Sequence, residues 1–132
     1  HERMVFLRDE KIKRIKNDLP PLEIIGPKNN KLLVVTWGSV YGPAYSAIEE
    51  LQEQGHSVTM LHLRHLNPFQ KNLAGVLRNF EKVLVPEMNL GQLSRLLRAE
   101  FLVDIISFAK VQGRPFLISE IRSRILELLA EK

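Results

Sequence analysis

The stretch LLVVTWGSVYGPAYSAIEELQEQG, residues 32–55, indicates the architecture that we expect for the whole chain. Its first part, Leu32–Trp37, is almost continuously apolar and partly β-branched, which is typical of a strand buried on both faces. A turn containing two glycines and a proline follows at residues 38–43. After the turn, apolar residues recur at the spacing of one helix face: Ala44, Ala47, Ile48 and Leu51. Gly55 is the residue type that most often closes a helix, so the stretch predicts a strand, a turn and a helix.

The same order of elements repeats along the rest of the chain. Further apolar strands are predicted at residues 57–64, 82–86 and 103–109. Strands that alternate with helices over short connections form parallel sheets. We therefore predict an α/β fold with an open, mostly parallel sheet of about four to five strands and helices on both faces. One sequence leaves the strand order open.

Three amphipathic helices are expected beyond the opening unit. The first is predicted at about residues 70–79, the second begins at Gly91, and the last is capped by Ser119. Their apolar faces are Leu73, Val76, Leu77 and Phe80 in the first, Leu93, Leu96, Leu97 and Phe101 in the second, and Ile121, Ile125, Leu128 and Leu129 in the last.

The chain is expected to have three parts. Residues 1–30 are predicted to be a charged N-terminal helical arm followed by a linker from a preceding domain, because Pro20 and Pro21 stop a helix. Residues 31–118 are the α/β domain, and residues 119–132 are a C-terminal helix. Since the sequence begins with His1 and not with methionine, we expect a piece of a longer polypeptide.

Composition limits the functions that this chain can perform alone. It has no cysteine, which excludes disulfides, thiolate metal sites and iron–sulfur ligation within these 132 residues. The net charge of +4 comes from interleaved signs, and the densest basic stretch, Arg8–Lys16, also holds Asp9 and Glu10. That pattern favours a solvated helix face over a nucleic-acid surface. No apolar run approaches the ~20 residues of a membrane span and no signal peptide is visible, so we expect a cytoplasmic protein without membrane or nucleic-acid contacts.

Candidate site residues lie where the predicted strands end, because ligands of open parallel sheets bind at that edge. Gly38, Ser39 and Gly42 follow the first strand and precede a helix. They form either a weak cradle for an anion or a tight turn that requires glycine. His62 and Arg64 end the next strand on the same side. We favour a satisfied core or interface histidine, with an anion contact by Arg64 as the next interpretation and a metal pair as the least supported.

A third loop, residues 86–93, carries Glu87, Asn89, Gly91 and Gln92 at a helix start. Glu87 could act as a general base, but no partner for it is visible in the sequence. We favour the structural interpretation, in which Asn89 caps the helix and Glu87 lies against the helix dipole. A fourth loop, residues 110–116, is suited to a protein contact. No spacing indicates a catalytic triad, so no catalytic residue is predicted.

Two long segments together resemble one family. They are VVTWGSVYGPAYSAIEELQEQGHSVTMLHLRHLNPF at residues 34–69 and VLVPEMNLGQLSRLLRAEFLVDIISFAKVQGRPF at residues 83–116. The motifs W-G-S-x-x-G, H-L-R-x-L-N-P-F, P-E-x-N-x-G-Q-L and V-x-G-x-P-F, in this order, are similar to the α subunit of 2-oxoacid:ferredoxin oxidoreductases of the 2-oxoglutarate type. The resembling part is its C-terminal domain, which is similar to that of transketolase. Where the family typically has proline after N-P-F, this chain has Gln70.

The resemblance implies a function for the parent protein. Such an enzyme decarboxylates a 2-oxoacid with thiamine pyrophosphate and Mg²⁺, passes electrons through iron–sulfur clusters to ferredoxin, and forms an acyl-CoA. The present domain is expected to be inactive alone and to bind none of these cofactors. It would serve assembly with the other α domains and the β subunit in a homo- or hetero-oligomer. Its polar edge, made of the nine candidate residues named above, would face the catalytic core and border the CoA path.

A different class of function stays open beside this one. The chain could be a stand-alone flavodoxin-like module that binds an anion or nucleotide, or a regulator of that fold. Which 2-oxoacid the parent enzyme uses does not follow from these residues.

Overall fold

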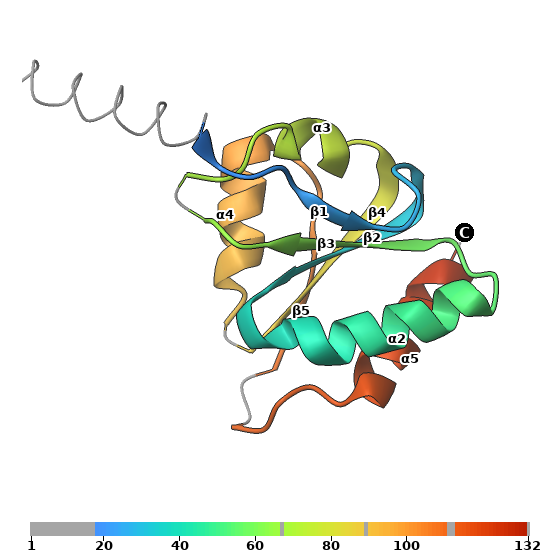
Figure 1. Cartoon of the computed structure of the whole chain (residues 1–132). Helices are drawn as coiled ribbons and strands as arrows, with labels where there is room; N and C mark the ends of the chain where they lie inside the picture. Colours follow the sequence, from blue (N-terminus) through green and yellow to red (C-terminus); the bar gives the residue numbers. More distant parts are fainter. Residues whose placement is uncertain (1–17, 67, 89, 111–112, 132) are drawn as a thin grey trace, which may run out of the picture.

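The computed structural model describes residues 18–66, 68–88, 90–110 and 113–131. The predicted arm helix lies outside these residues except for Asp18, and so does Asn89. Figure 1 shows a sheet with helices packed on its two faces. The predicted α/β class is confirmed.

The described residues form a five-stranded sheet in the order β1-β3-β2-β4-β5. The strands β2, β3, β4 and β5 are mutually parallel, and β1 joins β3 antiparallel at the sheet edge. The central strand β2 therefore has a parallel partner on each side, as its apolar run predicts. The bounds are Glu23–Ile25 for β1, Asn30–Trp37 for β2, Val58–Leu63 for β3, Phe80–Glu87 for β4 and Ile106–Ala109 for β5.

Helices cover both faces of this sheet (Figure 1). Leu32 and Val34 of β2 point into a core cluster with α2 and α5, whereas Leu33 and Val35 point into a second cluster with α3 and α4. All four side chains are fully buried, which explains why the strand shows no polar alternation. The helices are Tyr41–Glu53 (α2), Leu73–Leu77 (α3), Gln92–Phe101 (α4) and Ile118–Ala130 (α5), and a 3₁₀ turn, η1, spans Gly38–Val40.

The expected linker over residues 20–30 contains the strand β1. Ile24 pairs with Leu61 of β3, and Ile25 pairs with Met60. Ile24 packs against the second core cluster and Ile25 against the first, so the two faces of the sheet take alternate side chains. This short strand was not predicted, because the prolines before it and Gly26-Pro27 after it are signals of a turn or loop.

Several helix limits differ from the predicted ones. Phe80 begins β4 instead of ending the helix before it, and that helix, α3, has only five residues. Leu96 was expected on a buried helix face, yet its side chain is half exposed. Leu102 adopts a left-handed conformation with φ 54° directly after α4, so β5 begins at Ile106 and not at Val103.

The predicted cap of the last helix by Ser119 is wrong. The helix α5 already begins at Ile118, and Ser119 lies within it. The Oε1 atom of Glu120 accepts a hydrogen bond from the Leu117 amide at 2.8 Å and so occupies one of the free donors of this helix end. The helix is part of the main core, because Ile121, Ile125 and Leu128 belong to the first core cluster.

Candidate functional site

The strands β2, β3, β4 and β5 all end at one side of the sheet, which we call the carboxyl edge. Trp37 is in register with Leu63, and Glu87 is in register with Ala109. The loops and helix starts that follow these ends therefore gather along one edge, as parallel strands require. The candidate residues that the structure describes lie along this edge, but they occupy three separate places on it.

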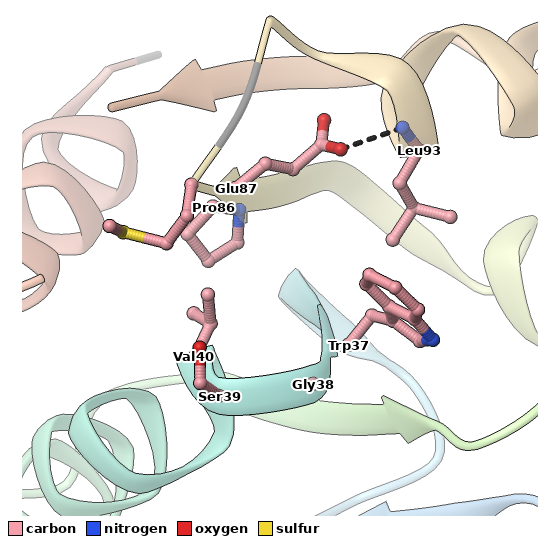
Figure 2. A pocket seen from close by; sticks show the side chains of 8 residues that line it. Trp37, Gly38, Ser39, Val40, Pro86, Glu87 and Leu93 are labelled. Carbon is pink, nitrogen blue, oxygen red and sulfur yellow. Dashed lines mark hydrogen bonds between the residues drawn. The ribbon is translucent and has the colours of Figure 1, made fainter. Parts of the chain in front are cut away.

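A pocket between the ends of β2 and β4 brings together Gly38, Ser39 and Glu87 (Figure 2). Its volume is about 80 Å³. Small-molecule sites usually measure roughly 300–1,000 Å³, so this pocket is too small for a nucleotide or for CoA. Its wall is largely apolar and consists of Trp37, Gly38, Ser39, Val40, Pro86, Glu87, Met88 and Leu93.

Glu87 binds the start of α4 from inside the protein. Its Oε1 atom accepts a hydrogen bond from the Leu93 amide at 2.6 Å (Figure 2). Its Oε2 atom accepts hydrogen bonds from the Ser94 amide at 3.1 Å and from the Ser94 hydroxyl at 2.8 Å. A buried carboxylate thus lies where the helix dipole favours an anion. This geometry agrees with the structural interpretation of Glu87 and leaves no room for a phosphate at these amides.

Gly91 permits the turn that brings Glu87 to the helix. It has φ 82°, a left-handed conformation that residues with a side chain rarely adopt. A Cβ atom at this position would also lie 3.1 Å from the hydroxyl oxygen of Ser107. Gln92 is the exposed first residue of α4. Gly91 and Gln92 therefore form part of the N-terminal end of α4.

His62 is buried at the end of β3 and has partners. Its Nδ1 atom is 2.8 Å from the hydroxyl oxygen of Thr36, and its ring meets the ring of Tyr41 edge-on at 4.7 Å between centroids. Burial lowers the pKa of His62 below its usual value; Glu23 opposes this shift and Arg64 adds to it. The neutral form is therefore favoured. The preferred interpretation, a satisfied histidine, agrees with this geometry.

Arg64 does not point to the pocket near Trp37. Its Nε atom donates to Oε1 of Glu23 at 2.9 Å, and both side chains are about half exposed. Such an exposed ion pair contributes about 0–1 kcal/mol to stability, but it neutralises the charge that an anion contact would need. Gly42 lies elsewhere again, in an open groove of about 650 Å³ with Pro43 and residues 116–119.

Exposed apolar side chains at the carboxyl edge were missed among the candidates. Four of the eight exposed large apolar side chains in the described part of the chain stand at strand ends or helix starts of this edge: Trp37, Leu90, Leu117 and Ile118. Tyr45, a fifth, is one turn into α2. Trp37 is the single tryptophan of the chain and is 46% exposed. In the sequence, only the position of this aromatic residue at the end of a strand could have indicated an exposed surface. The apolar run to which Trp37 belongs predicts instead that its side chain is buried in the core.

Cysteine, the usual ligand of an iron–sulfur cluster, is absent from this sequence. Within residues 18–66, 68–88, 90–110 and 113–131, no group of three or more His, Asp or Glu side chains could hold a metal ion. None of the helices described for this chain is both long and apolar enough to cross a membrane.

The fold of this chain is shared with a known class of proteins. It is similar to a split-gene transketolase, with a TM-score of 0.58 over 76% of this chain and 39% of the other, and at 16% identity this likeness concerns the fold alone. Residues 30–121 match the family described as pyruvate:ferredoxin oxidoreductase core domain II. The chain belongs to this family.

Relatives with known names support the assignment. Over 98% of its length, the chain is 46% identical to the 2-oxoglutarate oxidoreductase subunit KorA of Mycobacterium tuberculosis. It superimposes with a TM-score of 0.92 on a 2-oxoglutarate:ferredoxin oxidoreductase from Magnetococcus marinus, which is 29% identical and was solved with 2-oxoglutarate, coenzyme A and succinyl-CoA bound. The match covers 98% of this chain and 23% of that one. The chain spans about a fifth of the length of the curated relatives that it matches.

Proposed function

We propose that this chain is the C-terminal domain of the α subunit of a cytoplasmic 2-oxoglutarate:ferredoxin oxidoreductase. In this proposal the domain is non-catalytic, and its carboxyl edge docks against the catalytic core formed by the other α domains and the β subunit. The complete enzyme would convert a 2-oxoacid to an acyl-CoA and reduce ferredoxin. Thiamine pyrophosphate, Mg²⁺ and iron–sulfur clusters would be held by those other parts, since this chain lacks the ligands for a cluster.

The observation that supports docking is the distribution of charge and apolar surface at the carboxyl edge. Glu87 is bound by the start of α4, Arg64 by Glu23, and Lys110 by Glu120 at 2.6 Å. Beside these paired charges, four large apolar side chains of the edge are exposed: Trp37, Leu90, Leu117 and Ile118. Interface cores are poor in charge and rich in aromatic residues, and such exposed surface marks a contact with protein.

One alternative, a stand-alone module that binds a nucleotide or an anion, receives little support from the pocket beside Trp37 and the start of α4. A nucleotide or anion module would need a larger pocket than the 80 Å³ beside Trp37, with free amides at its helix start. Glu87 already accepts the hydrogen bonds of the Leu93 and Ser94 amides at the start of α4. The idea that the edge borders the CoA path stays a prediction.

The test compares two truncations in the complete, assembled enzyme. Trp37→Ala removes the largest exposed side chain of the edge, whereas Leu126→Ala removes an exposed leucine in the middle of α5. Loss of an interface anchor costs about 2 kcal/mol or more, which is roughly a thirtyfold loss of association. We expect that weakening for Trp37→Ala alone, measured by analytical ultracentrifugation together with 2-oxoglutarate-dependent ferredoxin reduction. Equal behaviour of the two variants would refute the proposal.

A further inference from the structure

Another hollow is lined by the first described residues, by β1 and by the start of α3. It shares no lining residue with the pocket near Trp37 and has a volume of about 410 Å³. Leu22, Ile24 and Val76 give it an apolar wall and also pack against the second core cluster. Lys28 and Lys71 line it as well. We call this hollow the entry groove.

One wall of the entry groove is fixed by Gln70, whose side chain is 2% exposed. Its Nε2 atom donates to the carbonyl oxygens of Pro20 at 2.7 Å and of Pro21 at 3.1 Å. Its Oε1 atom accepts a hydrogen bond from the Arg64 amide at 3.4 Å. The segment 19–22 is therefore held beside the end of β3 by hydrogen bonds within this domain.

The charges of the entry groove are unbalanced. Lys28 and Lys71 are exposed, and their side chains have no hydrogen bond or ion pair within the described residues. By contrast, Lys82 pairs with Glu131 and Lys110 with Glu120. Two unpaired ammonium groups beside an apolar wall are complementary to a segment that carries both carboxylates and apolar side chains.

We propose that the entry groove receives an acidic, partly apolar segment from another domain of the same α subunit. This inference rests on the proposed function, which supplies the rest of that subunit. The segment 19–22 forms one wall and leads to the preceding residues, so a domain attached there stays near the groove at an effective concentration of about millimolar. The curated relatives are about five times as long as this chain, which leaves ample polypeptide for such a contact.

The test uses the full-length α subunit without its partner subunit. A carbodiimide joins lysine amines directly to carboxylates that touch them, and mass spectrometry then locates the new amide bonds. We expect bonds from Lys28 or Lys71 to aspartate or glutamate outside residues 1–132. Their yield should be roughly tenfold above that at Lys31, an exposed lysine that does not line the groove, because only contacting pairs react.

Charge reversal gives the second measurement. Lys28→Glu with Lys71→Glu should speed hydrogen exchange of the Leu22, Glu23 and Ile24 amides in the full-length subunit roughly threefold or more, whereas Lys31→Glu should leave it unchanged. Bonds confined to residues 1–132, or a double variant that behaves like Lys31→Glu, would overturn the groove inference. If bonds at Lys28 and Lys71 appear only after the partner subunit is added, the proposed occupant is wrong. None of these outcomes alters the Trp37 test of the proposed function.

Discussion

The carboxylate of Glu87 and the hydroxyl of Ser94 lie 2.8 Å apart and join the end of β4 to the first turn of α4. The Ser94 side chain is fully buried and Glu87 is 5% exposed. An internal carboxylate therefore occupies the helix end that an external phosphate would otherwise use. The contact therefore fills a possible anion site with a side chain of the protein itself, and it fixes Glu87 in the wall of the pocket that Trp37 also lines.

Glu87→Gln should destabilise the fold. The amide group of glutamine would place two donors where Glu87 now accepts hydrogen bonds from the Leu93 and Ser94 amides. One or more buried donors would lose their partner, at a cost of about 1–3 kcal/mol. Denaturant unfolding followed by circular dichroism measures this loss. Ser94→Ala removes a single hydrogen bond and should cost about 1 kcal/mol.

Gly91→Ala tests whether the turn before α4 needs glycine. The left-handed backbone at φ 82° costs a residue with a Cβ atom about 1–2 kcal/mol. The new methyl group would also press on the Ser107 hydroxyl oxygen at 3.1 Å. Gly113→Ala is a matched control, since a Cβ atom there meets nothing within 4 Å and no positive φ is recorded for it. If both variants unfold at the same denaturant concentration, the turn does not depend on Gly91.

The parallel sheet could be predicted because its signal is local. Buried strands such as Leu32–Trp37 are apolar on both faces, and the helix of Ala44 and Leu51 has a clear period. The strand β1 could not be predicted, since three residues between prolines and a glycine carry no period. Its pairing with β3 depends on contacts far along the chain.

The positions of several candidate residues in the fold could be predicted, and their contacts less well. Gly38, Ser39 and Glu87 do meet at the carboxyl edge, because parallel strands place their ends together. The pairing of Arg64 with Glu23 depends on β1 and was therefore invisible in the sequence. The exposure of Trp37 was missed for a similar reason, since burial is a property of the assembled surface.

Ile125→Ala and Leu126→Ala test whether α5 is part of the domain core. Ile125 is fully buried against the first core cluster, whereas the adjacent Leu126 is exposed. Truncation of a buried isoleucine costs about 2–5 kcal/mol, and the exposed leucine should cost a small fraction of that. Denaturant midpoints of the two variants give the comparison. Equal midpoints would show that residues 119–132 form an appendage and not a core helix.

His62 predicts a dependence of stability on pH. Its folded pKa lies below the usual value of 6.5, so the unfolded chain binds the proton more readily. The stabilisation is therefore complete above that value and declines as the pH falls from it toward the lower folded pKa. His62→Gln removes the titrating group, so the unfolding free energy should change less steeply with pH between about pH 7 and 5. The glutamine amide can still form a hydrogen bond with the Thr36 hydroxyl. An unchanged slope would mean that His62 titrates alike in both states.

Gln70→Ala should release the incoming chain from the end of β3. It removes the hydrogen bonds to the carbonyl oxygens of Pro20 and Pro21, each contributing about 0.5–1.5 kcal/mol, and leaves a cavity at a buried position. Hydrogen exchange at Leu19 and Leu22 should then accelerate roughly tenfold. Gln52→Ala is the matched control, because Gln52 makes two similar bonds to Ile25 and Val58 at the other end of β1. Gln52→Ala should speed hydrogen exchange near Ile25 and leave the exchange rate at Leu19 unchanged. Equal acceleration of both segments in both variants would mean that β1 opens as one unit and that Gln70 has no separate role in holding the chain entry.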